Sequence, residues 1–287
     1  MEFLAILIAV AVMRLRGTGA PLQQDGWFFT LRGLLAGKLS GNRRHLALIL
    51  LPALGALLLQ VAVHGRFYGA LDLVFFVLVL IYSCGRGNLA QELAAYLQRW
   101  NRGDFHAAYR QLATDPAMSL SDDGSVADPV ALHELARRRL YYRGFERLFA
   151  ALFWFFFLGP AGAIAYRSAV LASEAARVEG ATGADSVPLR WLEWLPVRIC
   201  GLVFALVGDF DKGLYAWQRV VVGSRIGTAD ALDLCGNAAL GIQAPAAAQR
   251  SDELIVRGTC ELQSVLTLGN RALVVWLVIM GLLAMIF

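Results

Sequence analysis

The sequence has little charge for its length. Of its 287 residues, 17% are charged and 58% are hydrophobic, whereas a soluble domain carries about 25% charged residues. The hydrophobic residues gather in six runs: 3–13, 46–63, 70–84, 148–172, 197–208 and 272–287. A helix needs about 20 apolar residues to cross a bilayer, so the longest runs predict spans, while the shortest also fit re-entrant segments. The pattern predicts an all-α, polytopic integral membrane protein with five or six membrane helices or re-entrant segments.

The sequence also lacks the motifs of soluble enzymes and of metal sites. It contains no G-x-x-x-x-G-K-[ST] loop, no G-x-S-x-G and no H-E-x-x-H, which mark phosphate, nucleophile and zinc sites. Its four histidines and four cysteines are scattered without metal-ligand or C-x-x-C spacing, so neither a disulfide nor a zinc site is predicted. We therefore predict no catalytic residue, no metal and no cofactor. Nucleic acid is not an expected partner, because no basic patch is interleaved with aromatic residues.

The basic residues are concentrated in alternate segments between the apolar runs. Segments 14–45, 85–147 and 209–271 hold 21 of the 26 Lys and Arg residues. Because basic loops stay in the cytoplasm, we predict that these three segments are cytoplasmic and that the loop 173–196 is periplasmic. The chain 1–287 is then a single membrane domain with cytoplasmic helical loops.

Amphipathic patterns predict helices in the basic segments. Asn88 and Asp104 are expected to cap two helices of a hairpin, and a third helix is expected to run from Val130 into the span that follows. The segment 115–129 is expected to be a flexible loop, and 14–45 is expected to hold a short helix on the membrane surface. Three further helices are predicted at about 211–222, 229–241 and 251–268, the first capped by Asp209.

Two arginines are flanked by apolar residues. Arg167 lies within the run 148–172, where a charged side chain is expensive unless it is paired or hydrated. Either it reaches the interface, or it binds a buried anion or carboxylate beside Tyr166. Arg198 follows Pro196, which we expect to start a helix, so its charge adds to the positive helix end unless an anion compensates it. Together the two arginines predict a basic pocket open to the outer side, or else two interfacial anchors.

Gly159 and Pro160 interrupt the run 148–172 midway. Either the helix is broken there and lines a polar cavity, or it is kinked and packs closely against its neighbours. Trp194 is expected at the outer interface, in an aromatic belt. The candidate ligand-binding residues are Gly159, Pro160, Tyr166, Arg167, Trp194 and Arg198.

The chain resembles the AmpE family in two segments, LFWFFFLGPAGAIAYR (152–167) and WLPVRICGLVFALVGDF (194–210), and in its late apolar tail. The resemblance implies a multi-pass protein of the bacterial inner membrane that modulates signalling in β-lactamase induction, antibiotic resistance and peptidoglycan recycling. AmpE in turn is similar to the CobD/CbiB enzymes of cobalamin synthesis, which use ATP and Mg²⁺. Gly103 and Asp104, the Gly159–Arg167 pattern, and Pro196 with Arg198 match those enzymes.

The chain departs from the enzymes where they carry acidic residues. Glu146 is the one acidic residue in 143–149, and 168–172 and 190–194 lack the asparagine and paired aspartates of the enzymes. The resemblance therefore implies the scaffold and an anionic-ligand pocket, not amide-bond synthesis.

Three functional hypotheses remain. The first is a regulator that senses or handles an anionic cell-wall recycling ligand. The others are a CobD/CbiB-type enzyme acting with Mg-ATP on an anionic, nucleotide-like substrate, and a small muropeptide transporter. The expected partners are the lipid bilayer and such a ligand; a homo-oligomer stays open.

Overall fold

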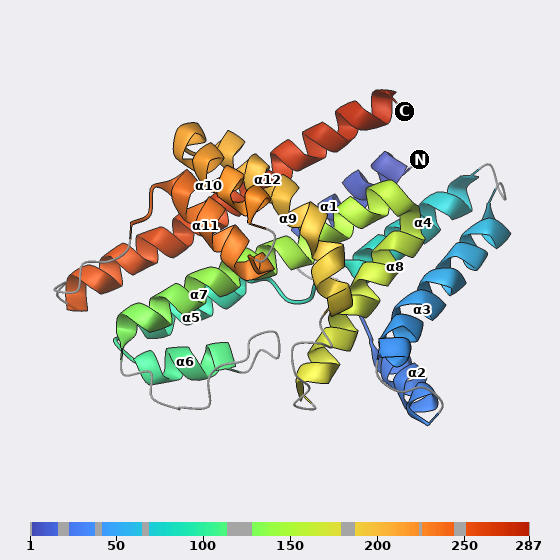
Figure 1. Cartoon of the computed structure of the whole chain (residues 1–287), viewed down its shortest axis with the longest axis horizontal. Helices are drawn as coiled ribbons and strands as arrows, with labels where there is room; N and C mark the ends of the chain where they lie inside the picture. The colour runs from blue at the N-terminus through green and yellow to red at the C-terminus, as the bar shows by residue number, and fades with distance from the viewer. Residues whose placement is uncertain are drawn as a thin grey trace. The chain divides into compact units, whose positions relative to one another are not determined.

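The computed structural model describes residues 2–16, 23–37, 42–64, 69–113, 128–178, 187–223, 226–243 and 251–286. Every regular element among these residues is helical (Figure 1), so the all-α prediction is confirmed. Contacts within the chain group it into two compact units. Unit 1 comprises Met1–Gly87, Glu146–Pro196 and Leu277–Phe287, and unit 2 comprises Asn88–Phe145 and Val197–Trp276.

Unit 1 is built from apolar helices that pack side by side (Figure 1). α3 (Asn42–Val63) lies along α8 (Ala151–Val178), and α4 (Ala70–Ser83) packs against both α8 and α1 (Glu2–Arg16). α2 (Gly26–Ala36) lies against α3, because the buried ring of Phe28 forms one apolar cluster with Leu48 and Leu171. The unit also contains the start of α9 (Val187–Val207) and the end of α12 (Ser251–Ile286).

Three helical stretches are long and apolar enough to cross a membrane, judged within the described ranges. They are Arg43–Val63, Pro129–Val178 and Glu253–Ile286; Ala70–Ser83 is a shorter apolar helix. On α3, side chains such as Leu50, Leu58 and Val61 are more than half exposed, as suits a helix surrounded by lipid. The protein is therefore a polytopic membrane protein. The short run 3–13 lies within α1, and the run 197–208 lies within α9 up to Val207.

Unit 2 is built from amphipathic helices. It contains α5 (Leu89–Trp100), α6 (Phe105–Ala113), α7 (Pro129–Gly144), α10 (Phe210–Val222), α11 (Thr228–Leu240), the end of α9 and most of α12. The predicted caps are confirmed: Asn88 accepts from the Ala90 N–H at 3.1 Å, Asp104 from the Ala107 N–H at 2.9 Å. Asp209 caps α10 by accepting from the Lys212 N–H at 3.2 Å. The α5–α6 hairpin therefore forms where its capping residues predict it.

Some predicted boundaries are wrong. The predicted loop 173–196 is helical at both ends, because α8 continues to Val178 and α9 already begins at Val187. The predicted helix 251–268 does not end there but continues through the last apolar run as α12. The expected loop 115–129 lies mostly outside the described residues.

Pro196 lies inside α9 instead of starting it. A proline within a helix has no N–H for the carbonyl four residues earlier, which here belongs to Leu192. The indole N–H of Trp154 donates to that carbonyl at 3.0 Å. A hydrogen bond from a second helix thus replaces the one that Pro196 cannot make, and the helix continues through the proline.

Candidate functional site

Arg167 is buried in unit 1 and is paired with two carboxylates. Its Nη2 atom lies 3.4 Å from Oδ2 of Asp25, and its Nη1 atom lies 3.9 Å from Oε1 of Glu146. The three side chains are 3–7% exposed. Of the two alternatives for Arg167, the structure shows the second, a buried carboxylate partner: the side chain does not extend to the membrane interface but is buried beside Asp25 and Glu146.

Asp25 receives further polar contacts. It precedes α2 without capping that helix by its side chain. Instead, its Oδ1 atom accepts from the hydroxyl of Tyr82 at 3.2 Å, and its Oδ2 atom lies 2.5 Å from Nη2 of Arg86. Two guanidinium groups and one phenol therefore converge on a single carboxylate.

The turn after α4 positions Arg86. The side chain of Gln23 donates to the carbonyl of Ile81 in the last turn of α4 and to that of Cys84, which follows the helix, at 2.9 Å. The backbone carbonyl of Gln23 accepts from Arg86. The N–H of Gly85 donates to the carbonyl of Arg147 at 3.0 Å. A Cβ atom at position 85 would lie 2.5 Å from Cγ of Arg147 and 2.9 Å from its Cα. Glycine is therefore required for this close approach, which puts Arg86 beside Asp25.

Glu146 reaches Arg167 from a π-helical turn. The turn η2 (Phe145–Ala150) lies between α7 and α8 in one continuous helical stretch. Such turns occur mostly as single insertions in α-helices and often at functional sites. Glu146 is the one acidic residue of 143–149 in the sequence, and in the structure its carboxylate lies beside the guanidinium of Arg167.

Asp25, Arg86, Glu146 and Arg167 form what we call the Asp25–Arg167 network. Asp25, Glu146 and Arg167 are buried, whereas the side chain of Arg86 is 45% exposed. The two carboxylates and two guanidinium groups balance in charge, which buried ions require. The separations of 3.4 and 3.9 Å from Arg167 exceed the roughly 2.7–2.9 Å of a tight charge-assisted hydrogen bond. Another anion could therefore bind this guanidinium without first breaking a tight ion pair.

A buried thiol lies beside this network. Cys84 ends α4 and is fully buried. A cysteine buried in apolar surroundings is usually inert as a nucleophile.

Tyr166 and Trp194 occupy different environments. The hydroxyl of Tyr166 donates to Oε1 of Glu193 at 3.3 Å, and both side chains are buried. Trp194 is 43% exposed. Tyr166 thus lies against a buried carboxylate from α9, whereas Trp194 is turned toward the surface.

Gly159 breaks α8 beside polar side chains. Its φ of 64° and ψ of −156° lie in a region that is essentially restricted to glycine, and Pro160 follows. A Cβ atom at 159 would lie 3.6 Å from Oε1 of Gln60 and 3.7 Å from Oε1 of Glu2. Those two side chains also line a cavity of about 1210 Å³. The structure thus interrupts the helix at Gly159. The cavity has a mostly apolar lining that includes neither Gly159 nor Pro160, so both alternatives for this position stay predictions.

Arg198 belongs to unit 2, whereas Arg167 belongs to unit 1. Nη2 of Arg198 donates to the carbonyl of Val220 at 3.2 Å, and the Arg198 carbonyl accepts from Trp217 at 2.7 Å. The expectation that Arg198 stands in the first turn of a helix is wrong, since α9 begins eleven residues earlier, at Val187. Each arginine is held by partners within its own unit.

Sequence reasoning missed three partners in unit 1: Asp25, Arg86 and Glu193. Asp25 reads as an ordinary helix cap, and Arg86 reads as one basic residue of a cytoplasmic segment. The one available signal is that the uncompensated charge of Arg167 requires a carboxylate somewhere in the chain.

The helices and the Asp25–Arg167 network define a polytopic, all-helical membrane protein with a buried ion-pair network. The family described as "Regulatory signalling modulator protein AmpE" matches residues 1–234, and the chain belongs to this family. The resemblance expected from residues 152–167 and 194–210 is confirmed.

Individual relatives extend the comparison. The "Protein AmpE" of Shigella flexneri is 28% identical over 169 residues, which are 56% of this chain and 58% of that protein. "Cobalamin biosynthesis protein CobD" of Chromobacterium violaceum is 27% identical over 222 residues, and that of Stutzerimonas stutzeri is 27% identical over 186 residues. These two matches cover 72% and 63% of this chain. The matches span about three fifths of each relative's length, and no solved structure matches this chain.

Proposed function

We propose that this protein is an inner-membrane regulator of β-lactamase induction that responds to an anionic ligand from cell-wall recycling. Its family is one of regulatory signalling modulators, which supports the regulatory role. The observation that carries the ligand part is the buried guanidinium of Arg167, held between Asp25 and Glu146 at 3.4 and 3.9 Å.

The network provides two states for a regulator. In the first, Arg167 links α8 to the start of α2 and to η2 through Asp25 and Glu146. In the second, the ligand's anionic group binds the guanidinium in place of the Asp25 and Glu146 carboxylates. A ligand shifts such an equilibrium only by its difference in affinity for the two states, and competition for Arg167 supplies that difference.

An anhydromuropeptide tests this proposal in lipid nanodiscs. We expect it to raise the apparent melting temperature of the protein, because a ligand that binds only the folded state stabilises it. Glu146→Gln removes a competing charge and should tighten binding by about tenfold, or about 1.4 kcal/mol, whereas Arg167→Gln should abolish it. Arg177→Gln, an exposed arginine on the same helix, is the matched control. Unchanged binding in Arg167→Gln, or no stabilisation at all, would contradict the proposal.

A CobD-type enzyme is the second candidate, since the C. violaceum protein named CobD matches 72% of the chain. The described residues hold no group of three or more His, Cys, Asp or Glu that could bind a metal ion, and Asp25 and Glu146 are paired with arginines. These side chains do not fit a Mg²⁺ site, and we derive no step through Mg-ATP. ATP turnover by the purified protein, lost in Arg167→Gln, would favour this candidate over the regulator.

We also propose the orientation that the basic segments predict, with 14–45, 85–147 and 209–271 in the cytoplasm and 173–196 in the periplasm. In a full-length Cys260→Ser background, which removes the exposed cysteine, a membrane-impermeant maleimide should label Arg190→Cys in intact spheroplasts. Arg110→Cys should react only after permeabilisation. Labelling of Arg110→Cys in intact spheroplasts would reverse the proposed orientation.

A further inference from the structure

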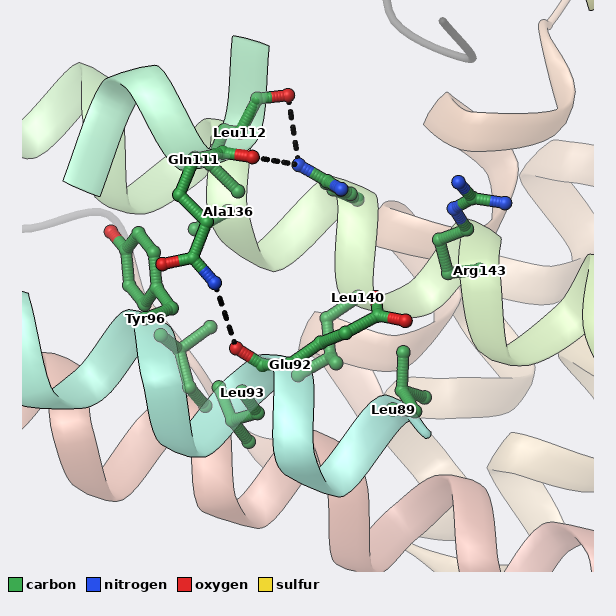
Figure 2. A pocket seen from close by; sticks show the side chains of 11 residues that line it. Leu89, Glu92, Leu93, Tyr96, Gln111, Leu112, Ala136, Leu140 and Arg143 are labelled. Carbon is green, nitrogen blue, oxygen red and sulfur yellow. Dashed lines mark hydrogen bonds between the residues drawn. The ribbon is translucent and has the colours of Figure 1, made fainter. Parts of the chain in front are cut away.

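Unit 2 contains a pocket that the proposed function does not use. It has a volume of about 340 Å³ and lies between α5, α6 and α7 (Figure 2), within the range of small-molecule sites, about 300–1,000 Å³. Its apolar lining consists of Leu89, Leu93, Leu112, Ala136, Leu140 and Leu262. Its polar lining consists of Glu92, Tyr96, Gln111, Arg139 and Arg143. We call this the α5–α7 pocket.

The buried hydroxyl of Tyr96 is evidence that the α5–α7 pocket binds a ligand. The side chain is 3% exposed, and its hydroxyl has no hydrogen-bond partner in the part of the chain that the structure describes. Buried polar groups are nearly always hydrogen-bonded, to protein, water or ligand. The ring is stacked on Trp100 with centroids 6.0 Å apart, which fixes its direction. Burial also raises the pKa of Tyr96, so its hydroxyl stays protonated and can donate to an acceptor.

Two arginines make the pocket electropositive. Arg139 and Arg143 are four residues apart on α7 and therefore share one face of that helix. Nη1 of Arg139 donates to the carbonyls of Gln111 and Leu112 at 3.4 and 2.8 Å, which holds the guanidinium at the end of α6. Glu92 is the one acid in the lining, so positive charge exceeds negative charge there. A guanidinium matches the geometry of carboxylates and phosphates.

We propose that the α5–α7 pocket binds a small amphipathic anion, a carboxylate or phosphate monoester on a compact apolar group. Figure 2 shows Tyr96 and Arg143 at opposite ends, with Leu93 and Leu140 between them. The acidic group lies at the arginine end, the apolar group contacts the leucines, and a second acceptor atom receives the hydrogen bond from Tyr96. A soluble phosphate monoester and an anionic lipid headgroup offer the same chemistry.

Phenyl phosphate is a probe of this chemistry, and benzyl alcohol is a similar aromatic compound without charge. By calorimetry on the full-length protein in phosphatidylcholine nanodiscs, phenyl phosphate should bind at least about tenfold more tightly than benzyl alcohol, as expected for charge-assisted hydrogen bonds. Arg143→Gln should weaken its binding by about tenfold. 4-Acetylphenyl phosphate adds a carbonyl acceptor at the Tyr96 end, and its binding should weaken by about fivefold in Tyr96→Phe, consistent with the loss of one hydrogen bond. Arg110→Gln, an exposed arginine of α6 outside the pocket, should bind as the wild type does.

Further measurements distinguish a lipid headgroup from a soluble anion as the ligand and show which results would overturn the proposal. Phosphatidic acid in the nanodisc should reduce phenyl phosphate binding if a lipid headgroup reaches the pocket, and should leave it unchanged if the ligand is soluble; either result keeps the anion site. Equal affinities for phenyl phosphate and benzyl alcohol, no binding of phenyl phosphate, or unchanged binding in both pocket variants would overturn the proposal. Arg139 is not substituted, because it also holds the end of α6. The variants in this test lie in unit 2 and leave Arg167 in place, so their outcome is independent of the function proposed for unit 1.

Discussion

Replacing Arg167 with glutamine is expected to lower the free energy of unfolding by about 3–5 kcal/mol, the usual effect of removing one partner from a buried ion pair. The physical reason is that Glu146 loses the positive charge of Arg167 at 3.9 Å. Asp25 also loses one of its two guanidinium partners and keeps Arg86. Titration with SDS in mixed micelles measures the change.

The double variant Arg167→Gln/Glu146→Gln sharpens this test. Glutamine at both positions removes the opposing charges together, so part of the lost stability should return, and the interaction energy of the cycle should be at least about 1 kcal/mol. Arg177→Gln removes an exposed arginine from the same helix and should change stability by less than about 0.5 kcal/mol. Additive effects of the two network substitutions would show that Arg167 and Glu146 are not coupled.

Substitution of Gly159 by alanine is expected to destabilise the protein by about 1–3 kcal/mol, because an L residue is strained in this backbone region. Its φ of 64° and ψ of −156° are the cause, and crowding is not: the nearest atoms to an added Cβ are 3.6–3.8 Å away. The same SDS titration measures the effect.

Gly55→Ala is the matched control. Gly55 lies within α3, and a Cβ atom there would meet nothing within 4 Å. Because alanine is a better helix former than glycine by about 0.8–1.0 kcal/mol, this variant should be as stable as the wild type or more stable. If the two alanine variants behaved alike, the break at Gly159 would carry no strain, and α8 would tolerate an ordinary residue there.

Local features of the fold could be predicted from the sequence. The caps Asn88, Asp104 and Asp209 are confirmed, and the interruption of α8 lies at Gly159, where the sequence places it. Each of these features depends on a few neighbouring residues. The helical hairpin α5–α6 follows from the spacing of its apolar side chains in the same way.

The candidate site could be predicted only in part. The apolar surroundings of Arg167 imply a partner but cannot say which of the acidic residues it is, and Asp25 lies 142 residues away in the sequence. The start of α9 could not be predicted either. Proline is favoured at a helix start, so the sequence predicts a helix start at Pro196. In the structure, the hydrogen bond from Trp154 allows Pro196 to lie inside α9.

The hydrogen bond from Trp154 to the carbonyl of Leu192 has a consequence for how these positions vary among related chains. The Leu192 carbonyl is available to Trp154 because Pro196 has no N–H to donate to it. Any other residue at position 196 would form the helical hydrogen bond to this carbonyl and leave the Trp154 indole without its acceptor. Positions 154 and 196 should therefore covary among related chains: where another residue replaces the proline, other residues should also replace the tryptophan.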